Sequence, residues 1–418
     1  MKKLITILLI SVLSFSAAAQ ESDLLGIDFD FLDSIFDEPA QSQENEAPQE
    51  EPVSIVQSLR RRGFEFNFSY IFRGAVNPGW VNLYPWEQYA GENFTWAPAV
   101  NLGSTFGIDA RISDSFRVQS VIKFDIPGEF PYISLGEFFF DYNFSDKVFL
   151  RAGKTGQSWG ISPNFGFTDL LSRIPEGGPS GPSYLIRFDV PIGIGGVQLL
   201  AQTRSNIANG DIPDLNSIGF GGKYNLAFQW ADFNLGAFYQ NNMASRAFFT
   251  VKTTLRDFEI YSEWLAAFDS HADNAVSFAF NFGFLKSFFN NKLDLNAEIF
   301  YNGEGRTNFF NSGTEYELSG TNPFLGGVNA AVNLLYRFNG GGSPRFFTRF
   351  LYGDDSFSIV PGIRLTPFQN MEIYLALPVS FGNGHYKTEA KNFKGEIKPV
   401  SLLLYVTFKG DLRANYYY

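Results

Sequence analysis

The amino-acid sequence predicts an all-β fold, a transmembrane antiparallel β-barrel of about 16–18 strands. Three observations support this fold class. Apolar and polar side chains alternate with a period of two in many short segments, as in strands with one apolar and one wet face. Beyond the N-terminal leader, no stretch approaches the roughly twenty apolar residues of a membrane-spanning helix. The chain holds 48 Phe and 40 Gly but only 18% charged residues, which does not suit a water-soluble monomer.

The N-terminus has the features of a secretory signal peptide over residues 1–19. Lys2 and Lys3 precede an apolar run over residues 4–13, and three alanines at 17–19 supply the small residues of a cleavage site. The apolar run is too short for a comfortable transmembrane anchor. Because the chain has no cysteine, no disulfide framework is available to it. We therefore expect a secreted protein that depends on backbone pairing and side-chain packing.

Residues 20–57 form an acidic segment with eleven Asp and Glu residues and no Lys or Arg. The leader carries +2 and this segment −11 of the overall −11, so residues 58–418, the predicted barrel, are close to neutral at −2. We expect this segment to be largely disordered, with a Glu, Gln and Pro-rich linker over residues 37–52. Residues 24–36 mix acids with large apolar residues, and two interpretations stay open: a docking segment or plug in the barrel mouth, or disorder.

The alternating pattern begins abruptly in residues 63–74. The face that we expect to contact lipid carries five aromatic residues: Phe64, Phe66, Phe68, Tyr70 and Phe72. Such a dense aromatic face is an aggregation hazard in water, which makes lipid its expected solvent. The same pattern recurs in about eighteen segments up to the C-terminus, and this number is uncertain by about two because sequence fixes strand boundaries poorly.

The last nineteen residues, 400–418, alternate in the same way and end on Tyr418. This stretch resembles the closing strand of outer-membrane β-barrels, and the resemblance implies the barrel assembly machinery as a partner that recognises the terminal aromatic residue. The stretch is about twice as long as a tilted strand needs to cross a bilayer. It therefore either projects beyond the membrane or is divided by a kink at Gly410. The alternative is a surface strand of a soluble domain, which does not need so apolar a face.

The long connections between the predicted strands are not distributed at random along the chain. If the N-terminus is periplasmic, all the connections on that side are short turns, as in outer-membrane barrels. The long connections all fall on the outer side: 75–96, 158–182, 206–215, 303–325 and 382–397. This sorting favours an even number of strands.

A barrel of about 16–18 strands leaves an aqueous lumen, so its inward side chains decide what it conducts. Basic and acidic residues on the expected inner face are nearly balanced. The pore-lining candidates are Arg73, Arg111, Arg117, Arg187, Glu259 and Glu263. Opposed charges either create a transverse field that selects solutes or neutralise one another across neighbouring strands.

Residues 151–181 join a strand to the connection that we count as the third outer loop. The run is similar to a strand-to-loop segment of substrate-selective porins, in which the third outer loop folds into the lumen and narrows it. The resemblance implies a pore constriction or solute-binding site formed by Arg151, Lys154, Gln157, Trp159, Asp169 and Arg173. In this interpretation Trp159 offers an apolar or sugar-stacking surface and the charged residues form opposing walls. The alternative is an external loop with no role in the lumen.

Catalytic chemistry finds little support in the sequence. The only histidines, His271 and His385, fall in separate predicted outer loops, and the chain has no cysteine. No spacing of His, Asp and Glu resembles a metal-ligand set, and no phosphate-binding motif occurs. We therefore predict no catalytic residue, no metal site and no cofactor, and no basic patch for nucleic acid.

These features predict a porin-like channel for passive diffusion of small hydrophilic solutes across the outer membrane of a diderm bacterium. Outer-membrane lipid and the solutes are its expected partners. Two alternatives stay open: a carrier of hydrophobic molecules of the fatty-acid-transporter type, and a surface adhesin that displays its outer loops. The early Asn-Pro-Ala signature of the fatty-acid-transporter family is missing from this sequence. The most similar stretch, Asn77-Pro78-Gly79, follows the first predicted strand. Porins are often trimers, so a homo-oligomer also stays open.

Overall fold

The structure is a computed structural model of the 418-residue chain. It describes residues 63–76, 78–80, 94–95, 98–126, 133–165, 183–203, 215–241, 244–268, 276–303, 327–339, 343–353, 356–382 and 400–417. The expected signal peptide, the acidic segment, Asp169 and Arg173 lie outside these residues. Within the described ranges, no helix has the length and apolarity needed to cross a membrane.

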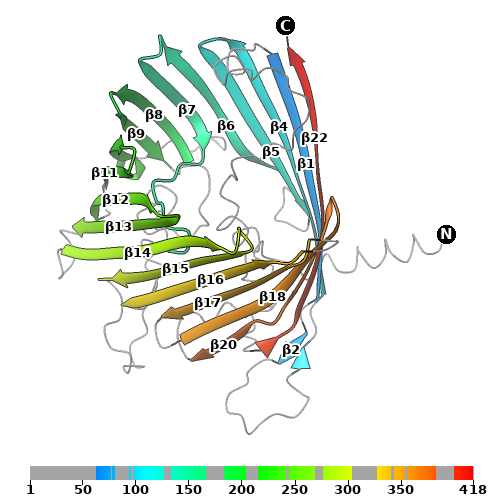
Figure 1. Ribbon diagram of the computed structural model, residues 1–418. Coiled ribbons are helices and arrows are strands. Elements are labelled where there is room, and N and C mark those ends of the chain that lie inside the picture. The colour runs from blue at the N-terminus through cyan, green and yellow to red at the C-terminus, as the bar shows by residue number, and fades with distance from the viewer. Residues whose placement is uncertain are drawn as a thin grey trace.

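The described residues form a closed barrel of eighteen antiparallel strands, which confirms the predicted fold class (Figure 1). In chain order the strands are β1 (Gly63–Val76), β4 (Pro98–Ser113), β5 (Phe116–Ile126), β6 (Ile133–Phe144), β7 (Val148–Thr155), β8 (Ser183–Ile192), β9 (Gly195–Thr203), β10 (Gly219–Ala227), β11 (Ala231–Gln240), β12 (Ser245–Leu255), β13 (Phe258–Phe268), β14 (Val276–Phe288), β15 (Leu293–Asn302), β16 (Val328–Arg337), β17 (Arg345–Gly353), β18 (Ser356–Phe368), β19 (Met371–Ala376) continued by β20 (Val379–Gly382), and β21 (Val400–Ser401) continued by β22 (Leu403–Tyr417). Short pieces β2 (Gly79–Trp80) and β3 (Phe94–Thr95) pair with each other. A short 3₁₀ turn, Leu215–Ser217, precedes β10.

The first strand closes the barrel by pairing with the last. β1 and β22 are in register from Gly63 opposite Tyr417 to Val76 opposite Leu404. The rings of Phe72 and Phe408 pack across this seam with centroids 6.4 Å apart. The terminal stretch therefore has the closing role that its alternation predicts.

Gly410 does not divide the closing strand. β22 runs through it without interruption, and the break falls at Leu402, between β21 and β22. A Cβ atom at Gly410 would lie 2.7 Å from the Tyr70 hydroxyl oxygen and 2.8 Å from its ring, so the missing side chain makes room for the tyrosine of the neighbouring strand. The glycine thus serves close packing at the seam, and of the two alternatives the kink at Gly410 does not occur.

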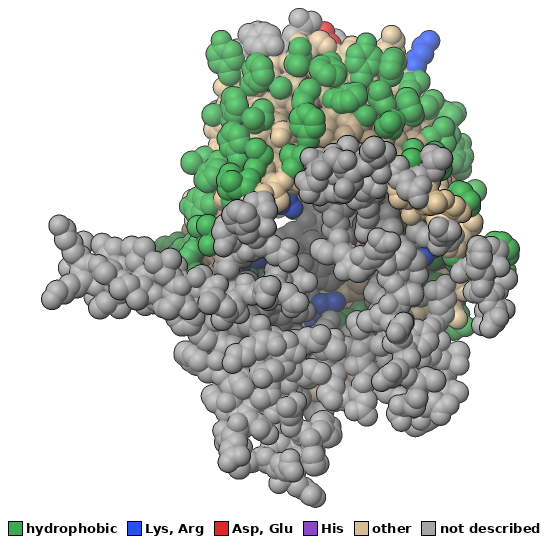
Figure 2. Space-filling view, turned by 180° about the vertical axis from the view of Figure 1, so that it is seen from behind, with side chains coloured by type: hydrophobic (Ala, Val, Ile, Leu, Met, Phe, Trp, Pro, Cys, Tyr) green, Lys and Arg blue, Asp and Glu red, His purple; other side chains and the backbone are tan. Residues whose placement is uncertain are grey.

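Outward and inward side chains alternate as predicted. On β1 the five aromatic residues from Phe64 to Phe72 are exposed on the outside of the barrel, whereas the residues between them are half-buried. Figure 2 shows hydrophobic side chains spread over the described outer wall. In an outer-membrane barrel this face contacts lipid.

At one end of the barrel all the connections are short, and in barrels of this kind that end is the periplasmic one. Ser145 with Asp146, and Arg256 with Asp257, have positive φ angles that suit tight hairpin turns. The Asp146 backbone N–H donates a hydrogen bond to Asn143 Oδ1 at 2.7 Å. Local turn chemistry therefore fixes the short side of the barrel.

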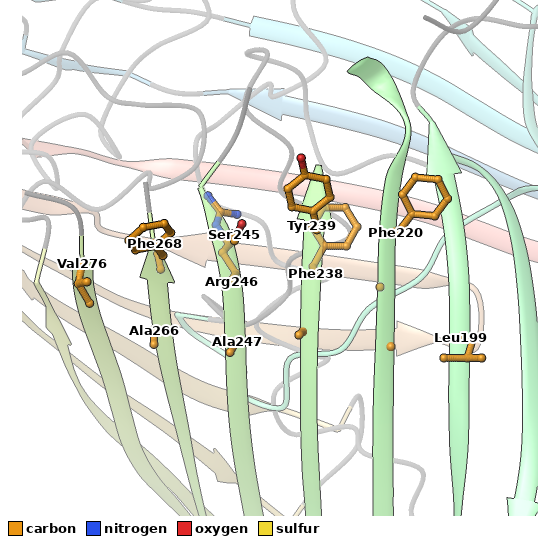
Figure 3. A pocket seen from close by; sticks show the side chains of 14 residues that line it. Leu199, Phe220, Phe238, Tyr239, Ser245, Arg246, Ala247, Ala266, Phe268 and Val276 are labelled. Carbon is orange, nitrogen blue, oxygen red and sulfur yellow. The ribbon is translucent and has the colours of Figure 1, made fainter. Parts of the chain in front are cut away.

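A groove on the outer wall faces lipid and not the lumen. Its floor is a row of small residues in direct register across four strands, Gly222, Ala237, Ala247 and Ala266. Large side chains of the wall, such as Phe220 and Tyr239, border it (Figure 3). The groove is therefore outside the solute pathway.

Candidate solute pathway inside the barrel

The chain that follows β7 turns into the barrel. Residues 156–165, which we call the inward segment, leave the end of β7 and run along the inner wall toward β12 and β13 (Figure 1). This segment begins the connection that the sequence predicts to be the third outer loop. Its position inside the barrel follows from hydrogen bonds to inward side chains of β8, β9, β13, β14, β15 and β16.

The first anchor of the inward segment lies on β8 and β9. Arg187 Nη1 donates to Gln157 Oε1, and Arg187 Nε donates to Asp189 Oδ2 at 2.7 Å. Gln198 Nε2 donates to the other oxygen of Asp189 at 2.7 Å, and Trp159 Nε1 donates to Gln198 Oε1 at 2.5 Å. One connected network therefore ties Gln157 and Trp159 to the wall.

The Trp159 ring is packed into the wall. It is only 2% exposed, it clusters with Leu200, Phe238 and Phe248, and its centroid lies 5.4 Å from that of Phe248. A Cβ atom at Gly221 would come within 2.7 Å of Trp159 Cη2, so the ring fills the space that this glycine leaves. The sequence predicts a stacking surface here, but the buried ring anchors the segment instead.

A side chain at Gly221 is expected to displace Trp159. Gly221→Val forces the ring out of its site at an overpacking cost of about 1–3 kcal/mol, which loosens the inward segment and raises single-channel conductance. Gly222→Val is the matched control, because Gly222 faces the lipid side of the same strand. Equal conductance of both variants and the wild type in planar bilayers would contradict the anchoring role of Trp159.

The second anchor is a pair of buried carboxylates, Glu263 on β13 and Glu298 on β15, which we call the carboxylate latch. Glu263 Oε1 accepts the backbone N–H groups of Ile161 and Ser162, the latter at 2.8 Å. Glu298 accepts the Ser162 hydroxyl at 2.6 Å and the Asn164 backbone N–H at 3.1 Å. Backbone donors of the inward segment therefore bind two carboxylates that are 0% and 4% exposed.

Amide and hydroxyl side chains complete the latch. Asn164 Nδ2 donates to Asn296 Oδ1 at 2.7 Å, and Asn333 Nδ2 donates to Asn164 Oδ1 at 2.9 Å. Asn281 Nδ2 donates to the Ser162 hydroxyl at 2.6 Å, and the Tyr261 hydroxyl donates to Glu298 at 2.7 Å. Such a network stabilises one arrangement of its members, because leaving any buried donor unpaired costs about 1–3 kcal/mol.

An aromatic contact ends the described part of the inward segment. The Phe165 ring stacks on Phe300 with centroids 5.3 Å apart, in a cluster with Ala331 and Leu351. The segment is thus held at both ends by an aromatic side chain and in the middle by carboxylates.

A row of charged side chains crosses the wall from β4 to β8. We call it the arginine row, and the strand register places its members directly opposite one another: Arg111, Arg117, Asp141, Arg151 and Arg187. Like charges in direct opposition destabilise a sheet unless acids separate or pair them. Figure 2 shows Lys and Arg side chains within the hollowed part of the molecule.

Acids on the same strands pair with the arginine row. Arg117 Nη2 lies 2.5 Å from Asp109 Oδ2, and Arg151 Nε lies 2.7 Å from Asp141 Oδ1. These two pairs neutralise charge across neighbouring strands, one of the two outcomes left open by the sequence, and Arg187 pairs with Asp189 within β8. The paired arginines still keep 17–31% of their side chains exposed, so they remain accessible from the lumen.

The structure separates Lys154 from the constriction residues predicted with it. Lys154 pairs in register with Phe138 and Tyr184, and Phe138 is 51% exposed on the lipid face. Its ammonium group donates to the Leu135 carbonyl at 2.6 Å. Because Lys154 lies three residues after Arg151 on one strand, the two side chains point to opposite faces. Lys154 therefore does not line the lumen.

The predicted pore-lining residues take different roles. Glu259 forms an ion pair with Lys252 at 2.8 Å, and Arg73 lies over the Tyr405 ring at 5.8 Å. Arg111, Arg117 and Arg187 belong to the arginine row. Glu263 is covered by the inward segment, so it holds that segment and does not line the open lumen.

The asparagines of the latch were not singled out from the sequence. Asn281, Asn296 and Asn333 are 0% exposed on the inner face of β14, β15 and β16. The sequence shows them only as polar residues at alternate positions of strongly apolar strands. Residues that face the lumen without contacting a partner segment show the same pattern. Their partners are more than one hundred residues away in sequence, so no local pattern reveals them.

Comparison with known proteins places the fold. No family model and no curated protein matches the sequence. The structure is similar to three Pseudomonas aeruginosa outer-membrane porins, OpdQ, OccK11 (OpdR) and OccK5 (OpdH). For OpdQ the TM-score is 0.54 at 12% identity, covering 83% of this chain and 98% of that chain. For OccK11 the TM-score is 0.53 at 10% identity, covering 85% of this chain and 99% of that chain. For OccK5 the TM-score is 0.51 at 12% identity, covering 83% of this chain and 98% of that chain.

At these identities the similarity concerns the fold alone. It agrees with the closed barrel, the short turns at one end and the apolar outer wall described above. The chain thus shares with these three structures the fold of a large, closed antiparallel β-barrel.

Proposed function

We propose that this barrel is a passive channel for small hydrophilic solutes, narrowed by the inward segment. The observation that carries the proposal is the anchoring of residues 156–165 inside the barrel by the carboxylate latch and by Trp159. A barrel of about 18 strands without such a segment leaves a wide aqueous lumen. A segment fixed to the wall gives the lumen a defined, smaller opening.

The chemistry of the inner wall supports hydrophilic solutes over hydrophobic ones. The arginine row and its acids present charged groups that are partly exposed to the lumen. An apolar molecule that moves along such a surface gains no free energy from burial of its apolar area. A polar solute can replace its hydrogen bonds to water by hydrogen bonds to the wall. The proposed function requires neither a cofactor nor a catalytic residue.

Planar-bilayer recording of the refolded full chain tests the proposal. Stable, discrete current steps whose size grows with salt concentration are the expected result, because ions cross a water-filled lumen. Protein that is correctly folded by circular dichroism but gives no steps would sink the channel proposal.

Removing one arginine from the row is expected to shift the ion preference toward cations. One unit charge about 8 Å from a permeating ion contributes roughly 0.5 kcal/mol in water, which is about a twofold change in relative permeability. Arg151→Gln should therefore shift the reversal potential in a salt gradient toward cation preference by about that factor. Lys154→Gln removes the same charge from the outer face three residues away, and it should leave the reversal potential unchanged. A shift of equal size in both variants would refute the assignment.

A further inference from the structure

β7 stops pairing with its neighbours at the point where the chain enters the barrel. Its ladder with β6 ends at Lys154 opposite Phe138, and its ladder with β8 ends at Thr155 opposite Ser183. β6 itself continues beyond Phe138 to Ile133. Backbone groups that lose their strand partners in a buried place need other partners, because leaving them unpaired costs free energy. The contacts at the end of β7 therefore determine which way the chain continues.

A β-bulge in β6 lies beside the end of β7. The register between β5 and β6 shifts next to Val121, which pairs with Glu137, and Gly136 is left as an extra residue in β6. Bulges commonly re-aim a neighbouring side chain. Val121 lies four residues after Arg117 on one strand, so it shares the inner face with this member of the arginine row. Its register partner Glu137 therefore points into the barrel.

Glu137 binds the end of β7 on this inner face. Its Oε1 atom accepts the Gly156 backbone N–H at 3.0 Å and the Thr155 hydroxyl at 3.2 Å. Thr155 is only 2% exposed, so its contact with Glu137 is shielded from bulk water. Gly156 is the first residue of the inward segment. A side-chain carboxylate therefore holds the backbone amide at which the chain leaves the wall.

β7 departs from regular strand geometry at Gly153, two residues before its end. The φ angle of Gly153 is 135°, which L side chains rarely adopt. A Cβ atom there would lie 2.2 Å from the Phe138 carbonyl oxygen, so only glycine allows β7 to approach β6 this closely. The strand is thus already irregular before Glu137 binds the residues that follow.

We infer that Glu137 is a positioning residue that turns the chain into the lumen at Gly156. The carboxylate latch and Trp159 hold the inward segment farther along, whereas Glu137 acts at its first residue. The next residue, Gln157, accepts a hydrogen bond from Arg187 of the arginine row. The point of departure therefore sets how far the segment stands from the arginine row.

The consequence for flow rests on the proposed channel function. In that channel, the gap between the inward segment and the arginine row is part of the narrow passage. Without the Glu137 contact, the start of the inward segment moves away from the end of β7 and the gap widens, while the latch still holds residues 161–164. We expect a larger conductance than in the wild type, but a smaller gain than in the variant without the latch.

Electron paramagnetic resonance distances test the positioning itself. The chain has no cysteine, so Ser158→Cys in the inward segment and Lys147→Cys in the turn before β7 give one pair of spin labels at exposed positions. With Glu137 present we expect one narrow distance. Glu137→Ala should raise the population at other distances roughly tenfold or more, the factor that corresponds to the loss of a hydrogen bond to a charged acceptor. Glu137→Gln keeps an acceptor oxygen for the Gly156 N–H and should restore the narrow distance.

Asp125→Ala is the matched control for these measurements. Asp125 lies on the inner face of β5, four residues after Val121, and its carboxylate lies beside Gly103 of β4. This variant removes a lumen acid and should keep the narrow distance. An unchanged distance in Glu137→Ala, or equal broadening in Glu137→Ala and Glu137→Gln, would overturn the positioning role.

Single-channel recording of the same variants without the cysteines connects the positioning to flow. Glu137→Ala should conduct more than the wild type, whereas Glu137→Gln should differ only by the effect of one charge. Equal conductance of Glu137→Ala and the wild type would overturn the role of Glu137 in limiting flow. Absence of current in every protein would refute the channel proposal, and the label distances would still decide the positioning role.

Discussion

Replacing both Glu263 and Glu298 by alanine raises the single-channel conductance by about twofold or more, because current through an aqueous lumen follows its open cross-section. The two carboxylates accept five hydrogen bonds from Ile161, Ser162 and Asn164. Hydrogen bonds to a charged group contribute roughly 1.5–3 kcal/mol each. Without the latch, the middle of the inward segment loses these bonds, so we expect it to move away from the wall between its anchors at Trp159 and Phe165.

The matched control for the latch is Glu259→Gln. Glu259 lies on the same strand and the same inner face as Glu263, four residues earlier, but it pairs with Lys252 and not with the inward segment. Glu259→Gln removes one charge from the lumen. Its conductance should differ from that of the wild type only by the effect of this one charge. If the double alanine variant migrates as a folded barrel and also keeps the wild-type conductance, the inward segment does not limit the current.

The second large effect concerns the lipid face. Phe68→Lys at the middle of β1 destabilises the barrel by about 2–4 kcal/mol, the cost of a cation near the bilayer midplane on an outward position. Phe68 is an exposed member of the aromatic face, and its register partners Leu412 and Phe106 lie on the same outer surface. Guanidinium unfolding from lipid vesicles measures the loss.

Ser69→Lys is the control for this substitution. Ser69 points into the lumen on the adjacent position, and its register partner on β22 is Asp411, which suits a lysine ammonium group. The control should unfold within about 1 kcal/mol of the wild type. Equal destabilisation by both substitutions would contradict the assignment of the two faces.

The barrel itself was predictable because its determinants are local. Period-two alternation fixes which residues of β1 face lipid, and turn residues such as Ser145 and Asp146 fix where strands reverse. The closing role of residues 400–418 also follows from a pattern within the segment. The position of the break in this stretch does not follow from the pattern. The pattern suggests a kink at Gly410, but this glycine is required by its contact with Tyr70 on another strand.

The site was only partly predictable, because its contacts join distant parts of the chain. Arg151 and Gln157 could be placed in the candidate pathway from their positions on the strand and the following loop. The role of Trp159 could not, because it depends on the space left by Gly221. Lys154 was assigned to the constriction by its resemblance to a porin loop segment. It lies on a strand, however, where alternation places its side chain on the outer face. Glu263 was expected in the open lumen, and only the partner segment, one hundred residues earlier, shows that it is covered.

Exclusion of neutral polymers from the conducting channel measures the central claim most directly. Polyethylene glycols small enough to enter the lumen lower the conductance, and larger ones leave it unchanged, so the cut-off reports the width of the narrowest part. We predict a sharp cut-off for the wild type and a shift to larger polymers when Glu263 and Glu298 are both alanine. An identical cut-off in the two proteins would show that residues 156–165 do not narrow the channel.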